Sequence, residues 1–131
     1  MRLRDSDEVR AWLDKADRDL RMVRLAMGAD VPLWDQACFH AQQAAEKALK
    51  GLLVAADLPV PRNHDLLQLI EPLMDELTAI ESLEEAAALL TQYGVGPRYP
   101  SFLAPETQLD AGSALESAER IVAYVLRLLP D

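Results

Sequence analysis

The stretch WDQACFHAQQAAEKALKGLLVA, residues 34–55, decides the fold. Its apolar residues recur at steps of three and four, the period of a helix with one buried side. They are Trp34, Ala37, Cys38, Ala41, Ala45, Ala48, Leu52 and Ala55. So many alanines predict a close approach of neighbouring helices, and Gly51 predicts a neighbouring backbone that passes too near for a side chain. We therefore expect this helix at the centre of a bundle.

Helical periodicity also marks the segments on either side of this stretch. Residues 9–27 repeat apolar side chains in threes and fours, after a capping-box-like start at Asp5 and Glu8. Residues 66–80 carry a second stripe of this kind, which Pro72 must kink or divide. Each segment therefore predicts a helix, and the later helix is interrupted.

Three further helix starts are marked by capping residues. Asn63 can cap the helix that follows it, and Ser82 with Glu85 forms a capping box for a helix that runs to about Tyr93. Thr107 can cap the last helix of the chain, whose apolar residues again step by threes and fours. No strand and no internal repeat is predicted.

Length and composition set the class of protein. With 131 residues, 50% of them apolar and 27% charged, the chain matches one ordinary globular domain. Helices with short connections mostly pack antiparallel. We therefore expect a single domain, residues 1–131, folded as an all-α, antiparallel up-and-down bundle of about five helices.

Simple counts disfavour several kinds of site. The apolar runs fall far short of the roughly 20 residues that span a bilayer, and the start of the chain lacks an apolar signal core. We therefore expect a cytoplasmic protein without a membrane contact. Cys38 is the single cysteine and only His40 and His64 offer imidazole, so neither a structural zinc site nor a cofactor is predicted.

Charge restricts the partners. The formal net charge of −9 repels a phosphate backbone unless basic residues gather locally. Residues 63–97 hold no Lys or Arg but seven acids, which are Asp65, Glu71, Asp75, Glu76, Glu81, Glu84 and Glu85. This acidic arm predicts, as one alternative, a non-catalytic helical interaction scaffold for a basic protein partner.

The central helix also carries polar residues that are candidates for a site. His40, Gln43, Lys47 and Lys50 are spaced three, four and three apart, which places them on one face. The spacing predicts either a solvated stripe, which a pair between Glu46 and Lys50 favours, or the lining of a groove.

His64 and Arg98 are the remaining candidates. His64 follows Asn63 at a predicted helix start, where local hydrogen bonding or packing competes with a functional role. Arg98 lies beside Tyr99 in a loop rich in Gly and Pro. An arginine held there can grip a phosphate or a carboxylate with two hydrogen bonds, or can simply tie the loop to a helix.

Three motifs together resemble those of the HEPN (higher eukaryotes and prokaryotes nucleotide-binding) family. They are FHAQQAAEKALKGLL at residues 39–53, NHDL at residues 63–66 and RYP at residues 98–100. The resemblance covers nearly the whole chain. It implies a helical bundle that commonly forms a homodimer, often encoded beside a small nucleotidyltransferase with which it makes a toxin–antitoxin-like or modifier pair. Many members of the family are metal-independent ribonucleases.

The ribonuclease motif of the family is absent here. In those members an Arg is followed four to six residues later by a His, and the homodimer joins two such pairs in one cleft for proton transfer and phosphate stabilisation. Arg98 has no His in that window, and Arg62 stands only two residues before His64. The chain instead resembles a subgroup with an Arg-Tyr-Pro loop, for which nucleotide binding or partnership with the nucleotidyltransferase is implied.

The functional prediction is therefore a nucleotide- or RNA-binding homodimer that acts with a nucleotidyltransferase. Its ligand is expected near seven residues, which are His40, Gln43, Lys47, Lys50, His64, Arg98 and Tyr99. The alternative is a metal-independent RNA endonuclease toxin, in which His64 and Arg98 come together in space. No catalytic residue is assigned.

Overall fold

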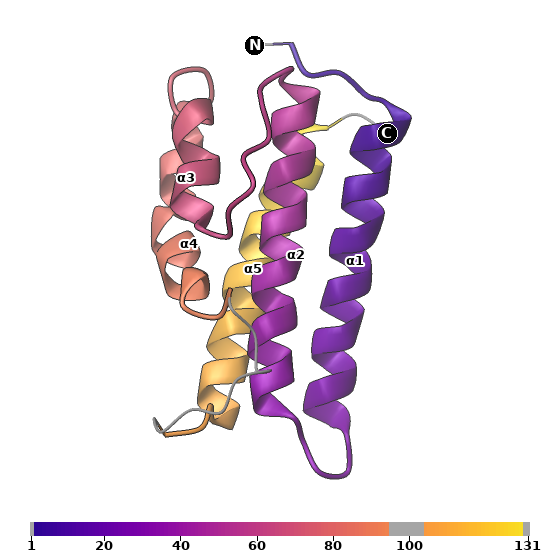
Figure 1. The fold of residues 1–131 in the computed structure, drawn as a ribbon, viewed down its shortest axis with the longest axis vertical. Helices are drawn as coiled ribbons and strands as arrows, with labels where there is room; N and C mark the ends of the chain where they lie inside the picture. The colour runs from indigo at the N-terminus through magenta and orange to yellow at the C-terminus, as the bar shows by residue number, and fades with distance from the viewer. Residues whose placement is uncertain (1, 95–103, 130–131) are drawn as a thin grey trace.

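The computed structural model describes residues 2–94 and 104–129 (Figure 1). Its α-helices are α1 (Asp7–Gly28), α2 (Trp34–Ala55), α3 (Leu66–Ile70), α4 (Glu84–Thr91) and α5 (Gln108–Leu128). Two 3-10 helices, Glu71–Leu73 and Thr78–Leu83, lie between α3 and α4, and these ranges contain no strand. The prediction of an all-α bundle of about five helices is confirmed.

Helix α2 lies at the centre of the bundle, as the alanine pattern predicts. It contacts α1, α3, α4 and α5, and six of its alanines are completely buried. Small side chains let the backbones approach: a Cβ built on Gly51 would lie 3.0 Å from the Cβ of Trp12 in α1. The close neighbour expected at Gly51 is therefore α1.

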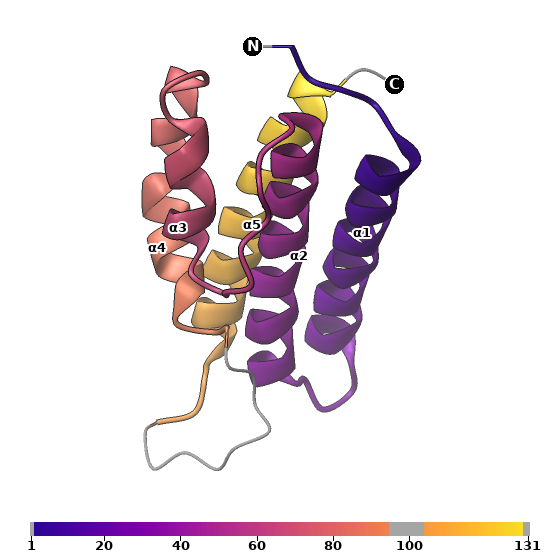
Figure 2. The same cartoon turned by 45° about the horizontal axis from the view of Figure 1, so that its top comes forward.

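The helices do not simply alternate in direction. In Figures 1 and 2, α1 descends and α2 ascends, and the chain then descends beside α2 as an extended segment, residues 57–65. Helix α3 ascends, α4 descends and α5 ascends again. The extended segment descends where an alternating bundle would have a helix, so α5 runs in the same direction as α2 and packs beside it. The extended segment also brings His64 to the side of α2.

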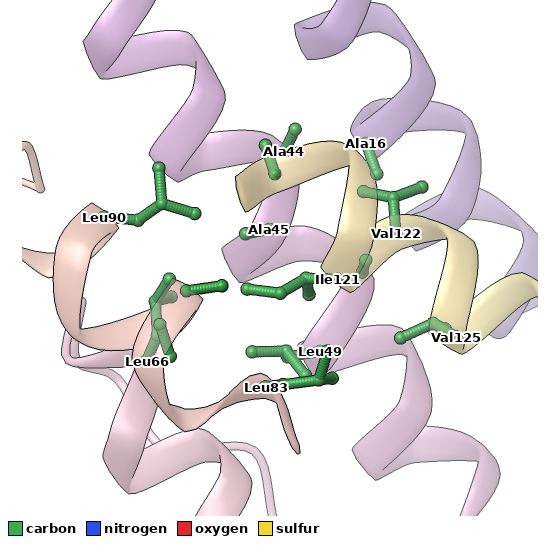
Figure 3. Close-up of a cluster of buried hydrophobic side chains, with 14 of the residues drawn as sticks. Ala16, Ala44, Ala45, Leu49, Leu66, Leu83, Leu90, Ile121, Val122 and Val125 are labelled. Atoms are coloured by element: carbon green, nitrogen blue, oxygen red, sulfur yellow. The ribbon is translucent and has the colours of Figure 1, made fainter. Parts of the chain in front are cut away.

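The hydrophobic core is built between α2, α5 and the α3–α4 arm. Figure 3 shows Leu49 of α2, Ile121 of α5 and Leu90 of α4 among a cluster of aliphatic side chains. All three are completely buried. Burying a leucine or isoleucine side chain contributes about 1.5–3 kcal/mol. This packing fixes the α3–α4 segment against α2.

Pro72 divides the third helical segment, as predicted. It lies in the first turn of the 3-10 helix Glu71–Leu73, directly after α3 ends at Ile70. The missing amide hydrogen of a proline and its ring are incompatible with a continuous α-helix at that point. The chain therefore continues in short pieces as far as α4.

The predicted caps are right at one helix and wrong at three. Thr107 forms a full capping box with Asp110. Ser6 rather than Asp5 caps α1, because its side chain accepts from the Val9 amide. Asp65 rather than Asn63 caps α3.

The capping box expected at Ser82 and Glu85 does not form. The hydroxyl of Ser82 donates instead to the carbonyl oxygen of Ala79, inside the 3-10 helix Thr78–Leu83. Leu83 precedes α4 without a side-chain cap. The Ser82 hydroxyl therefore lies against the preceding turn, and no capping hydrogen bond joins it to α4.

Candidate functional site

Two buried carboxylates underlie the polar stripe of α2. Asp19 of α1 and Glu46 of α2 are the only charged residues among the buried side chains of the described ranges, with side-chain exposures of 9% and 6%. A buried charge is tolerated only when it is paired and hydrogen-bonded. Each carboxylate holds one imidazole and one ammonium group, so the molecule contains two similar polar centres.

The first centre, which we call the Asp19 centre, joins α1 to α2. Oδ1 of Asp19 lies 2.8 Å from Nδ1 of His40, and Oδ2 lies 2.5 Å from Nζ of Lys47. Both partners come from the polar stripe of α2 and are mostly buried. The two oxygens of Asp19 are therefore both occupied by groups from the neighbouring helix.

The second centre, the Glu46 centre, joins α2 to the extended segment. Oε1 of Glu46 lies 2.7 Å from Nδ1 of His64 and accepts from Nε2 of Gln42 at 3.1 Å. Oε2 accepts from Nζ of Lys50 at 3.3 Å. Nε2 of Gln42 also lies 3.1 Å from the carbonyl oxygen of His64, which holds the backbone of that residue as well as its ring.

The imidazole of His64 is held in one orientation but remains open to solvent. Its side chain is 64% exposed, whereas the side chain of His40 is 21% exposed. A carboxylate only accepts hydrogen bonds, so the neutral ring carries its proton on Nδ1 and presents the lone pair of Nε2 outward. This pairing of carboxylate and imidazole is the arrangement that orients a histidine for proton transfer or for an anionic ligand.

Local hydrogen bonds fix the backbone around His64. Asn63 accepts from the amide of Asp65, and the amide of Leu66 donates to the hydroxyl of Thr91. Gly94 lies against the same residue: a Cβ built on it would stand 3.1 Å from the Cβ of His64. The end of the α4 segment therefore supports His64 directly, and the NHDL motif acts as a positioning element.

Charge within the two centres is balanced. The ammonium groups of Lys47 and Lys50 face the carboxylates of Asp19 and Glu46. Nζ of Lys50 also lies 5.9 Å from the ring centroid of Trp12, within the range of a cation–π contact. In a chain of net charge −9 this face carries no excess negative charge, so an anion meets less repulsion here than over the acidic arm.

The structure brings together five of the seven residues that the sequence predicts for the ligand site. His40, Gln43, Lys47 and Lys50 lie on one face of α2, and His64 joins them through Glu46. Gln43 connects to the same network because its Nε2 donates to Oε1 of Gln42 at 2.7 Å. The two other predicted residues, Arg98 and Tyr99, lie outside the described residues.

The sequence interpretation did not identify the two carboxylates that organise the site. Asp19 occupies a core position of α1, three residues after the buried Ala16 and four before the buried Val23. An acid at such a position predicts a buried partner of opposite charge, and this signal was available. The pair between Glu46 and Lys50 forms as expected, but it is buried rather than solvated.

The thiol of Cys38, near the start of α2, and the hydroxyl of Tyr93 form a neutral hydrogen-bonded pair. Burial raises the pKa of the Cys38 thiol to about 11, although a hydrogen bond with Tyr93 acts in the opposite direction. Burial likewise raises the pKa of the Tyr93 hydroxyl to about 12. A thiolate is the reactive form of cysteine, so Cys38 is a packing residue and not a nucleophile at neutral pH.

Two further structural properties bear on function. Within residues 2–94 and 104–129, no group of three or more His, Cys, Asp or Glu side chains is arranged to hold a metal ion. No helix in those ranges combines the length and the apolar character needed to cross a membrane.

The chain is a helical-bundle protein with a polar face on its central, alanine-rich helix. The family model of the HEPN domain matches residues 9–128. The chain therefore belongs to the HEPN family, so the predicted family is confirmed, whereas the subgroup with an Arg-Tyr-Pro loop stays a prediction.

Two solved structures are similar over nearly their whole length. TT1696 from Thermus thermophilus is 37% identical with a TM-score of 0.84, and the match covers 95% of this chain and 100% of that chain. ST0689, an archaeal HEPN homologue, is 29% identical with a TM-score of 0.74, covering 94% and 98%. No curated protein matches the sequence.

Proposed function

We propose that the chain is a cytoplasmic HEPN homodimer that binds a nucleotide or an RNA end at the Glu46 centre and acts with a nucleotidyltransferase. The observation that carries this proposal is the exposed imidazole of His64, held 2.7 Å from the buried carboxylate of Glu46. The imidazolium form of such an oriented ring donates a hydrogen bond from Nε2 to a phosphate oxygen. Hydrogen bonds to charged groups contribute about 1.5–3 kcal/mol.

The residues divide into direct and supporting roles in this proposal. His64 contacts the ligand, with Gln43 and Lys50 beside it and Arg98 and Tyr99 contributed by the RYP loop. Lys47 and His40 bind Asp19 and hold α1 against α2, and the ammonium group of Lys47 adds positive charge at longer range. Family membership supports the partnership with a nucleotidyltransferase in a toxin–antitoxin-like or modifier pair.

Isothermal titration calorimetry with mono- and dinucleotides tests the ligand half of the proposal. The wild-type protein is expected to bind, and both His64→Ala and Arg98→Ala are expected to weaken binding about tenfold or more. Arg62→Ala is a matched control, because Arg62 is an exposed cation only two residues before His64. Absence of binding by the wild-type protein to every nucleotide would remove the ligand half.

Co-purification tests the partner half. The chain and the nucleotidyltransferase encoded nearest to it are expressed together, with a tag on one of them. A stable complex, or transfer of a nucleotidyl group to this chain detected by mass spectrometry, is expected. Failure to form a complex together with no change in mass would contradict the partnership and leave nucleotide binding to be judged by calorimetry.

A metal-independent RNA endonuclease is the second candidate function. The specific observation in its favour is the free lone pair of His64 Nε2, for which the described part of the chain offers no hydrogen-bond partner. Such a nitrogen can accept the proton of a ribose 2′-hydroxyl. Cleavage of structured RNA in the presence of a chelator, lost in His64→Ala and kept in Arg62→Ala, would favour this candidate over simple binding.

A further inference from the structure

Exposed apolar side chains gather where α1 turns into α2. Seven large apolar side chains are exposed within residues 2–94 and 104–129, and four of them lie at this turn. They are Met22 at 44%, Leu25 at 69%, Val31 at 79% and Leu33 at 50% exposure, and we call them the turn patch. Single exposed leucines are ordinary, but a cluster rimmed by polar residues marks a contact surface.

The turn patch surrounds a hollow in the surface. A depression of about 400 Å³ is lined by Met22, Leu25, Ala26, Leu33, Asp35, Gln36 and His40. The depression is mostly apolar and can accept a protruding aliphatic side chain. Because His40 belongs to the Asp19 centre, the turn patch continues directly into the polar face of α2.

The charges around the turn patch are self-complementary. Arg18 and Arg21 lie on α1 before the patch, whereas Asp30 lies in the turn next to Val31 and Asp35 lies beside the hollow at the start of α2. All four side chains belong to exposed residues, and Arg21 and Asp30 make no ion pair within the described residues. A partner surface of one sign would be repelled by one side of this rim.

A second copy of the chain satisfies both sides of the rim. A two-fold axis crossing α1 between Met22 and Leu25 sets two α1 helices antiparallel, with Met22 of each copy against Leu25 of the other. The same rotation carries the arginines of each copy towards Asp30 of the other. Apolar contacts then lie at the centre and opposite charges at the edge, which is the usual anatomy of a stable interface.

We infer that the homodimer forms through the turn patch, with two α1 helices packed antiparallel. This inference rests on the homodimer of the proposed function and names its interface. The polar faces of the two α2 helices then adjoin at their His40 ends, on either side of the two-fold axis. The two copies of His64 remain open to ligand, since each lies on the far side of its own polar stripe.

Sedimentation velocity over a wide range of protein concentrations tests the interface. The wild-type chain is expected to be dimeric, and Leu25→Glu and Leu33→Glu are expected to weaken dimerisation at least about 100-fold, because each buries two charges. Leu126→Glu is the matched control: Leu126 is 52% exposed on α5, outside the patch, and its variant should dimerise like the wild type.

Charge exchange gives a second test that does not alter the apolar side chains. Arg18→Glu and Asp30→Arg alone should each weaken the dimer by roughly threefold to tenfold, and the double variant should recover most of the loss. A wild-type chain that stays monomeric, Leu25→Glu and Leu33→Glu variants that dimerise normally, or a double variant weaker than both single variants would each overturn the interface.

Nucleotide titration of the same proteins separates this inference from the proposed function. If the dimer responds to these substitutions as expected but binds no nucleotide, the ligand proposal is wrong and the interface is retained. If the wild-type chain is a monomer that binds nucleotide, the interface is wrong and the ligand proposal is retained.

Discussion

The Asp19 centre and the Glu46 centre are built from the same groups but differ in where the imidazole points. Each has a buried carboxylate, a histidine bonded through Nδ1 and a lysine. At Asp19 both partners are mostly buried between two long helices. At Glu46 the ring of His64 comes from an extended segment and is 64% exposed. The comparison teaches that backbone context, and not side-chain identity, separates a structural clamp from a candidate ligand site.

The largest expected effect comes from removing either carboxylate. Asp19→Ala leaves Lys47 without its partner in a mostly buried position and should lower the free energy of unfolding by roughly 3 kcal/mol. Glu46→Ala should cost a similar amount and should also abolish nucleotide binding. Asp14→Ala is the matched control, because it breaks only the exposed pair with Arg18 and should cost less than about 1 kcal/mol.

Urea denaturation followed by circular dichroism measures these losses. If Asp19→Ala were as mild as Asp14→Ala, the clamp role of the Asp19 centre would be wrong. If Glu46→Ala bound nucleotide normally, the two centres would not differ in function.

Two glycines allow the α1–α2 contact and the Glu46 centre to be disturbed separately. Gly51→Ala brings a Cβ within 3.0 Å of Trp12 and should cost about 1–3 kcal/mol by separating α1 from α2. Gly94→Ala presses on His64 and should weaken nucleotide binding more than it lowers stability. Gly112→Ala, with no atom within 4 Å of the new Cβ, should stabilise α5 by about 0.5–1 kcal/mol. Equal behaviour of all three variants in thermal unfolding and calorimetry would contradict the close approaches.

Exchanging the two histidines for alanine sharpens the comparison further. His64→Ala should reduce nucleotide affinity about tenfold with a change in unfolding free energy below about 1 kcal/mol, because its side chain is largely exposed. His40→Ala should show the reverse, with a stability loss near 1 kcal/mol and little change in affinity. Calorimetry measures the affinity and denaturation measures the stability of the same two variants. The opposite pattern would make the Asp19 centre the ligand site and the Glu46 centre the structural clamp.

The last expected effect is confined to alkaline pH and concerns the neutral pair of Cys38 and Tyr93, which serves as a reference for the two charged centres. Burial raises the pKa of Cys38 to about 11 from an ordinary value near 9. Between these values the unfolded chain loses a proton that the folded chain keeps, so the free energy of unfolding falls as pH rises above 9. Cys38→Ala should make this alkaline decline shallower when urea denaturation is repeated from pH 8 to pH 10.5. An unchanged slope would mean that Cys38 does not contribute.

Helical periodicity predicted the bundle well because buried apolar residues repeat at the helical period wherever a helix has one buried side. The central place of α2 followed from its alanines and from Gly51. The caps were predicted less well, since Asp5, Ser6, Asn63 and Asp65 all carry side chains that can cap, and only backbone geometry chooses among them. The sequence alone does not distinguish between neighbouring polar residues that can each cap a helix.

The spatial grouping of the candidate residues was predicted in part, and their role in binding stays a prediction. His40, Gln43, Lys47 and Lys50 were correctly grouped because a helix places such spacings on one face. Their burial was not predicted, because the partners Asp19 and His64 lie far away along the chain. The extended pass of residues 57–65 brings His64 beside Glu46, and no local pattern encodes that crossing.

The contact between Lys50 and Trp12 gives the molecule an internal optical probe. The ammonium group lies 5.9 Å from the indole centroid and is bonded to the same carboxylate that holds His64. A bound anion that draws on either of these groups must alter the electric field at the indole. Intrinsic tryptophan emission can therefore follow occupancy in real time without a label, and Trp34→Phe isolates the signal of the informative ring.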